Sequence, residues 1–260
     1  WNSIVNFTQN ESIVQSLIPG TDRIVIQSEF NNVQVVAVPG RQFQLYAGTY
    51  LRDPATNRPI INANNGLRQA GPLENLGSVM PRFTMGFVNN FSYRNFSLTT
   101  TIDWRDGGLL HSATVAGLWA NGQVEETAVN REGTFIDTFG VLQNTDGTFR
   151  DNDVPVRSAQ TFWGNLAPSG VAVTNTFDAS FVKLREVSLS YNIPKSVLGK
   201  GVIKALQVGV EGRNLALLYS KVPHIDPEAN LFGAGADGFG VERNTVPSTR
   251  SYGFNVRLTF

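Results

Sequence analysis

The sequence predicts an all-β protein whose antiparallel strands form one segment of a transmembrane β-barrel. Three observations predict this. Apolar and polar residues alternate over stretches of about ten residues, the length of a membrane-spanning strand. The connections between these stretches are either very short or very long. Only 16% of the residues are charged, against roughly 25% in an ordinary soluble domain.

The composition excludes several classes of protein. The net charge is zero, with 21 basic and 21 acidic residues, so no overall field attracts nucleic acid. There is no Cys, which excludes disulfides and thiolate metal sites. The longest apolar runs, such as residues 215–219, are far shorter than the ~20 residues of a membrane helix. The chain starts without Met, a basic region or an apolar signal core, so we expect a fragment of a longer protein.

Residues 1–8 supply one expected strand, and a hairpin between residues 83–93 and 96–105 is the clearest element. Apart from Val88, each hairpin strand places its large apolar side chains on one parity, and Arg94-Asn95 form the short turn between them. Ten extended residues span about 33 Å. Tilted by about 45°, such a strand covers roughly 23 Å, close to the apolar band of an outer-membrane barrel.

Three more strands are expected at residues 180–191, 205–218 and 250–260. In the first of them the alternation changes phase at Arg185-Glu186, which predicts a β-bulge. The linking residues 192–204 contain Pro and Gly and are typical of a turn. About six strands therefore alternate with three long connections, at residues 9–81, 106–178 and 219–249, and a short helix is expected within the second connection.

The alternative is a soluble or surface-attached β-domain that binds glycans. Sandwich strands usually have about six residues, with turns every 8–12 residues, whereas these strands are longer and their connections uneven. The two interpretations differ in where the apolar side chains of each strand lie. A sandwich buries these side chains against a second sheet, and a barrel leaves them facing lipid. The residues concerned are Phe83, Phe87, Phe96, Leu98, Phe254 and Leu258.

No catalytic or metal site is predicted, so we expect neither an enzyme nor a cofactor. The two histidines, His111 and His224, lie far apart in loop-like regions without a paired carboxylate, and each is expected to be solvated. The glycine-rich residues 233–240 lack the Lys-Ser/Thr of a phosphate loop. Residues 150–153 offer side-chain oxygens but lack the distal Glu of an EF-hand, which favours an Asx-rich turn.

The polar parity of the strands predicts which charged residues face the barrel lumen. Barrel strands alternate between residues that face lipid and residues that face the lumen. The lumen-facing candidates are Asp103, Arg105, Glu211, Arg213, Asn255 and Arg257.

Several stretches, in collinear order, resemble the C-terminal part of the SusC/RagA family of TonB-linked outer-membrane proteins from Bacteroidetes. The most specific is SFVKLREVSLSYNIPKSVL at residues 180–198. The others are LGSVMPRFTMGFVNNFSYRNFSLTTTIDWRDGG at 76–108, GRNL at 212–215, IDPEAN at 225–230 and PSTRSYGFNVRLTF at 247–260. The resemblance covers most of the chain.

The resemblance implies that residues 1–260 are the C-terminal part of a 22-stranded barrel, without its plug and its TonB box. Such proteins import a glycan, an oligosaccharide or an oligopeptide across the outer membrane, driven by TonB and capped by a SusD-like lid lipoprotein. It implies that the C-terminus is periplasmic and that the three long connections are extracellular loops. The implied partners are the lid, TonB through the missing region, the rest of the barrel, lipid and substrate, and not nucleic acid.

The resemblance also implies two sets of site residues. The last strand is similar to the signal that outer-membrane assembly machinery reads, through Tyr252, Phe254, Val256, Leu258 and Phe260. Loop aromatics are candidates for contact with the substrate or the lid, because aromatic faces stack on sugar rings and hold peptides. They are Trp119, Phe149, Trp163, Tyr219 and Phe239.

Overall fold

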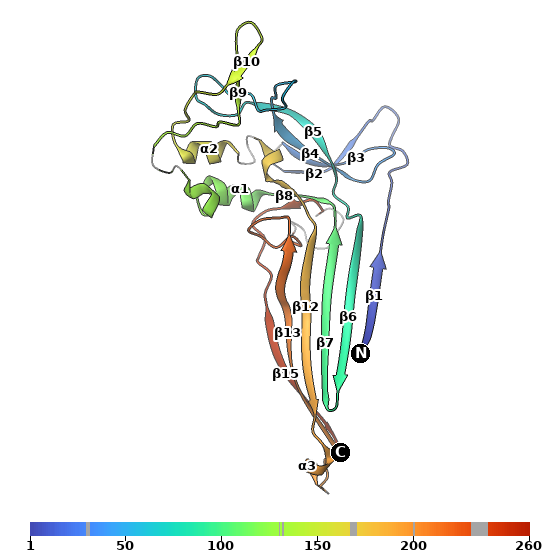
Figure 1. Ribbon diagram of the computed structural model, residues 1–260. Helices are drawn as coiled ribbons and strands as arrows, with labels where there is room; N and C mark the ends of the chain where they lie inside the picture. Colours follow the sequence, from blue (N-terminus) through green and yellow to red (C-terminus); the bar gives the residue numbers. More distant parts are fainter. Residues whose placement is uncertain (30–31, 130, 132, 167–170, 200, 230–238) are drawn as a thin grey trace.

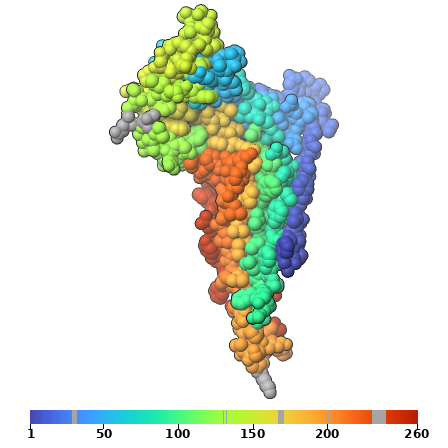
Figure 2. All heavy atoms as spheres, in the orientation of Figure 1, coloured from blue at the N-terminus to red at the C-terminus, as the bar shows by residue number. Residues whose placement is uncertain are grey.

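A long antiparallel sheet, which we call the wall, carries a broader layer of smaller sheets and short helices at one end (Figure 1). The computed structural model describes residues 1–260 except 30–31, 130, 132, 167–170, 200 and 230–238. A space-filling view shows the same division into a slender wall and a wider upper layer (Figure 2). Within the described residues, no helix is long and apolar enough to cross a membrane.

The wall has six strands, each antiparallel to its neighbours. In spatial order they are β1 (Asn2–Thr8), β6 (Phe83–Tyr93), β7 (Phe96–Asp106), β12 (Phe181–Asn192), β13 (Ala205–Ser220) and β15 (Ser251–Thr259). The register of β12 shifts between Leu184 and Glu186 against both of its neighbours. This shift confirms the bulge that the sequence predicts, with Arg185 as the extra residue.

The cross-strand register divides the wall into two faces, because opposed residues in a ladder point to the same side. One face, the apolar face, pairs Phe87 with Ile102 and Val210 with Phe254. Phe96 and Phe254 remain 50% and 80% exposed. A sandwich would bury these rings under a second sheet, whereas the structure leaves them exposed, as a barrel segment requires. Among the described hydrophobic residues that are buried, Phe181 alone belongs to the wall.

All long connections leave the wall at one end (Figure 1). The turn at Arg94-Asn95, the short helix α3 (Lys195–Leu198) and the C-terminus lie at the other end. The short connections at 94–95 and 192–204 therefore share one end, as the alternation of short and long connections predicts.

The three connections that we expected to be long loops are instead largely folded. One sheet contains β2 (Ile24–Glu29), β3 (Val33–Ala37), β4 (Gln44–Tyr50) and β5 (Ala70–Ser78). A second contains β8 (Leu109–Ser112), β11 (Thr176–Asp178) and β14 (Val241–Glu242). In the third, β9 (Val141–Gln143) pairs with β10 (Phe149–Asp151). The helices of the connections are α1 (Ala113–Ala120), η1 (Glu125–Ala128), α2 (Ala159–Asn165) and η2 (Ala172–Asn175). We call these elements the upper layer. Several of its strands have only two to four residues, too few for alternation to predict them.

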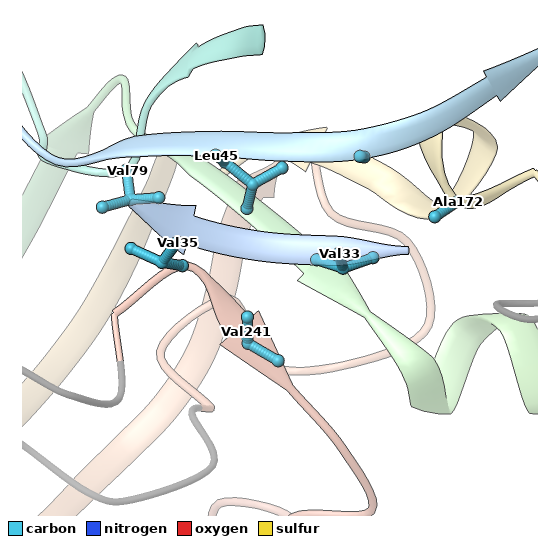
Figure 3. Packing of buried hydrophobic residues seen from close by; sticks show 7 residues of the cluster. Val33, Val35, Leu45, Val79, Ala172 and Val241 are labelled. Atoms are coloured by element: carbon cyan, nitrogen blue, oxygen red, sulfur yellow. The ribbon is translucent and has the colours of Figure 1, made fainter. Parts of the chain in front are cut away.

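One hydrophobic cluster joins all three connections (Figure 3). Val35 and Leu45 come from the first, Ala172 from the second and Val241 from the third, and all are at most 2% exposed. Burying a Val or Leu side chain is worth about 1.5–3 kcal/mol. The upper layer is thus one packed body rather than three separate loops, and it contains nearly all of the hydrophobic core.

A substitution at Gly240 tests the packing of this hydrophobic core. The φ of Gly240 is 82°, and a Cβ there would lie 2.4 Å from Cγ1 of the buried Val79. We expect Gly240→Ala to destabilise the upper layer by about 2–4 kcal/mol, since left-handed strain and overpacking add. Gly20 is the matched control, with a φ of 84° and nothing within 4 Å of its Cβ position. Hydrogen exchange of β3 and β14 in the full-length protein measures the effect. Equal losses in both variants would contradict this packing.

Candidate functional site

The second face of the wall carries the charged residues. The ladder pairs Asp103 with Lys183, Glu186 with Arg213, and Asn255 with Gly209, and these positions lie opposite the apolar face. We call this the polar face. All six residues predicted from parity to face the lumen share it, namely Asp103, Arg105, Glu211, Arg213, Asn255 and Arg257.

An ion-pair network closes the end of the polar face next to the upper layer. Lys183 is only 3% exposed, and its Nζ lies 2.6 Å from Oδ2 of Asp226 and 2.6 Å from Oε2 of Glu228. Arg185 donates from Nε to Oδ2 of Asp103 at 2.6 Å and from Nη1 to Oε2 of Glu228 at 2.6 Å. The network therefore pins the segment 222–229 against β12 and β7.

The bulge in β12 explains how so many charges gather there. In a regular strand Lys183 and Arg185 would share a face and Glu186 would point away. The extra residue restores Glu186 to the polar face, where its Oε2 lies 3.7 Å from Nε of Arg213. A second, looser pair joins Arg213 to Glu211 at 3.5 Å. The bulge thus places a second, separate set of ion pairs on the polar face, beside the network.

Asp226 and Glu228, two of the three carboxylates in the network, are ionised at neutral pH. Burial raises the pKa of Asp226, and hydrogen bonds from Lys183, Ser248 and the backbone outweigh it, so that the pKa lies below its usual range. Burial likewise raises the pKa of Glu228, which Arg185 and Lys183 together bring below its usual range. A carboxyl with a lowered folded-state pKa stabilises the fold above its unfolded pKa. The network therefore keeps its contribution at neutral pH and loses it as the pH falls below about 4.

Sequence reasoning missed Lys183, Arg185, Asp226 and Glu228 as site residues. Lys183 and Arg185 lie in the stretch at 180–198, and Asp226 and Glu228 in the stretch at 225–230. In the stretch KLRE, Lys183 and Arg185 share the polar parity of their strand. Two basic residues at alternate positions were the signal that could have identified the first pair. The contacts of Lys183 with Asp226 and of Arg185 with Glu228 each join residues 43 positions apart. They depend on how the third connection, residues 219–249, folds.

A cavity of about 290 Å³ adjoins the network on the polar face. Its lining includes Asn6, Thr84, Arg105, Arg185 and Glu228. Nε of Arg105 is buried without a hydrogen-bond partner among the described residues. The arrangement can bind polar or charged groups by hydrogen bonds and ion pairs. No group of three or more residues suited to holding a metal occurs in the described part of the chain.

The aromatic candidates do not form one site. Trp119 in α1 and Trp163 in α2 come together, with ring centroids 5.6 Å apart. Phe149 begins β10, Phe239 packs against the main hydrophobic cluster, and Tyr219 pairs with Val182 on the apolar face. The structure thus brings together two of the five residues.

The histidines differ from expectation. His111 is fully buried in β8 instead of solvated, and burial lowers its pKa to about 4. Its Nδ1 lies 3.4 Å from Oγ1 of Thr176. Nε2 of His224 is 2.9 Å from Oε1 of Glu126, a partner 98 residues away that the sequence did not indicate. Both corrections arise because the connections fold into the upper layer.

The two remaining candidates for chemistry lie in loops. In residues 150–153, Asp151 pairs with Arg58 and Asp153 with Arg150, each at 2.7 Å. These carboxylates are therefore engaged in ion pairs. Of the glycine-rich residues 233–240, positions 233–238 lie outside the described residues.

Comparison with known proteins identifies relatives along the whole chain. No family model matches. The chain is 26% identical over 292 residues to TonB-dependent receptor P3 of Formosa agariphila, which covers all of this chain and 27% of the receptor. It is 26% identical over 188 residues to TonB-dependent receptor P26 of the same organism, covering 71% of this chain and 18% of that receptor. It thus spans about a quarter or less of these curated relatives.

Solved structures share the fold. The RagAB peptide importer in its closed-closed state matches 99% of this chain and 27% of the importer chain, with a TM-score of 0.66 and 17% identity. Its open-open state matches with a TM-score of 0.62 and 16% identity. These matches confirm the fold class, a segment of an antiparallel transmembrane β-barrel. They also confirm the predicted resemblance to TonB-linked transporters of the SusC/RagA type.

Proposed function

We propose that this chain forms wall and extracellular surface of a TonB-dependent importer that carries a nutrient across the outer membrane with a SusD-like lid lipoprotein. The observation that carries the proposal is the division of the wall into two faces. One face exposes Phe96, Val210 and Phe254, as contact with lipid requires, and the other carries the ion-pair network. A barrel in a membrane needs an apolar outside and keeps a polar inside.

The orientation follows from the two ends of the wall. Outer-membrane barrels have short periplasmic turns and long extracellular connections. We therefore place α3, the turn at Arg94-Asn95 and the C-terminus in the periplasm, and the upper layer outside the cell. TonB would act through a plug region outside this chain.

The last strand has a separate role in this proposal. β15 pairs only with β13 among the described strands, so its other edge is available to another strand of the barrel. Tyr252, Phe254, Val256 and Leu258 line its apolar face and Phe260 follows it, all of them exposed. We propose that these five residues form the strand that outer-membrane assembly machinery recognises.

The substrate class is an oligosaccharide or an oligopeptide. The RagAB importer carries peptides, and the aromatic and amide side chains of the upper layer suit both classes. No bond is made or broken in this mechanism. The polar face and the upper layer bind the substrate, and a change in conformation, driven through TonB, admits it to the lumen.

Uptake by cells tests the proposal. The full-length protein containing this chain is expressed with its lid lipoprotein, and the uptake of labelled oligosaccharides and oligopeptides is measured with and without functional TonB. We expect the protein in the outer-membrane fraction and an uptake of one class that disappears without TonB. A protein that fractionates as soluble without detergent, or uptake that does not depend on TonB, would refute the proposal.

A further inference from the structure

A cavity in the upper layer lies apart from the polar face. It has a volume of about 290 Å³, at the lower end of the roughly 300–1,000 Å³ of small-molecule pockets. It lies where the end of α1, η1 and the start of α2 approach one another. Its lining includes Trp119, Asn121, Arg131, Gln160 and Trp163.

Two indole rings form the apolar part of the lining. The rings of Trp119 and Trp163 are inclined at 53° with centroids 5.6 Å apart. Trp163 packs edge-on against Phe162 and Trp119 edge-on against Phe177. The rings are therefore held by aromatic packing, and a ligand meets flat surfaces that are already in place. Preorganised aromatic faces suit the C–H face of a sugar ring.

Amide side chains form the polar part. Neither the Asn121 amide nor the Gln160 amide has a hydrogen-bond partner within the described residues, and both side chains are exposed. Each amide offers a donor and an acceptor side by side, which matches two neighbouring hydroxyls. Arg131 is held in place, because its Nε donates to the Thr127 carbonyl at 3.1 Å and its Nη2 to the Gly122 carbonyl. The cavity thus combines fixed ring faces with free amides.

The surroundings favour a sugar over a peptide. Peptides usually bind in extended form along a free strand edge, where backbone hydrogen bonds hold them. The described residues that line this cavity come from helices and loops, and none of them comes from a strand. No carboxylate occurs among the described residues that line it, so the ammonium group of a peptide would find no acidic partner among them.

We propose that this cavity is a subsite for one or two pyranose rings of an oligosaccharide at the extracellular surface. The proposal rests on the proposed function and narrows its substrate class to glycans. The site lies in the upper layer, away from the network around Lys183, so it would capture the substrate before the substrate enters the lumen.

Binding to the full-length protein in detergent tests the subsite. The probes are a panel of neutral and uronic-acid oligosaccharides and a panel of oligopeptides, with quenching of Trp fluorescence and calorimetry as readouts. We expect at least one oligosaccharide to bind. The double variant Asn121→Ala/Gln160→Ala should bind it at least about tenfold more weakly, since two hydrogen bonds are lost. Both side chains are exposed, so folding is preserved.

Gln123→Ala is the matched control, because Gln123 is an exposed amide on the same turn that does not line the cavity, and it should leave affinity unchanged. Failure of every oligosaccharide to bind, unchanged affinity in the double variant, or a loss of oligopeptide binding alone would each overturn the subsite. Uptake that depends on TonB but is insensitive to the double variant would reject the subsite and leave the proposed function standing.

Discussion

Replacing Lys183 with Met is expected to release the segment 222–229 from the wall, at a cost of about 3–5 kcal/mol. The substitution keeps most of the side-chain volume but removes the ammonium that lies 2.6 Å from both Asp226 and Glu228. Glu228 keeps its pair with Arg185, whereas Asp226 is left without a cationic partner among the described residues. An uncompensated, largely buried carboxylate is far costlier than the loss of an exposed pair. Hydrogen exchange of residues 222–229 in the full-length protein measures the release.

Lys221→Met is the matched control. Lys221 also bonds a carboxylate, that of Asp178 at 2.8 Å, but the two side chains are 45% and 34% exposed. Such a pair contributes about 0–1 kcal/mol. If both variants accelerate exchange equally, the network does not hold this segment. A triple variant in which Lys183, Asp226 and Glu228 are all replaced by apolar residues of similar size should recover much of the loss.

Replacing Phe254 with Arg is expected to reduce sharply the amount of folded protein in the outer membrane. Phe254 is 80% exposed on the apolar face, in the middle of β15 and opposite Val210. Arg at the midplane of a lipid-facing strand costs about 2–4 kcal/mol. The heat-modifiable mobility of the full-length protein from outer-membrane fractions reports the folded amount.

The neighbouring position supplies the control for this variant. Asn255 lies in the same strand but on the polar face, opposite Gly209. Asn255→Arg therefore adds the same charge to the polar face instead of the apolar face. It should leave the folded amount close to that of the native protein. Similar losses in both variants would mean that the apolar face does not meet lipid.

Local pattern predicted the wall well. The alternation of apolar and polar residues depends only on the pleat, which turns successive side chains to opposite sides. It therefore predicted the hairpin around Arg94-Asn95, the shared face of Asp103 and Arg257, and the bulge beside Arg185. Each of these features follows from the alternation within single strands or from the short turn between two of them.

The upper layer could not be predicted in this way. Its strands are too short to show alternation, and its core brings Val35, Ala172 and Val241 together from three separate connections. The burial of His111 and the pairing of His224 with Glu126 have the same origin. A sequence pattern reports which face a residue takes, but not which distant segment will cover it.

The sequence by itself determined which strands build the wall and which side of each strand is polar, because these properties follow from a period of two residues. Only the tertiary structure decided that Lys183 and Arg185 hold Asp226 and Glu228, and that Trp119 and Trp163 share a cavity. Those contacts join residues 43 or 44 positions apart. They exist only because the long connections fold back as one packed layer over the end of the wall.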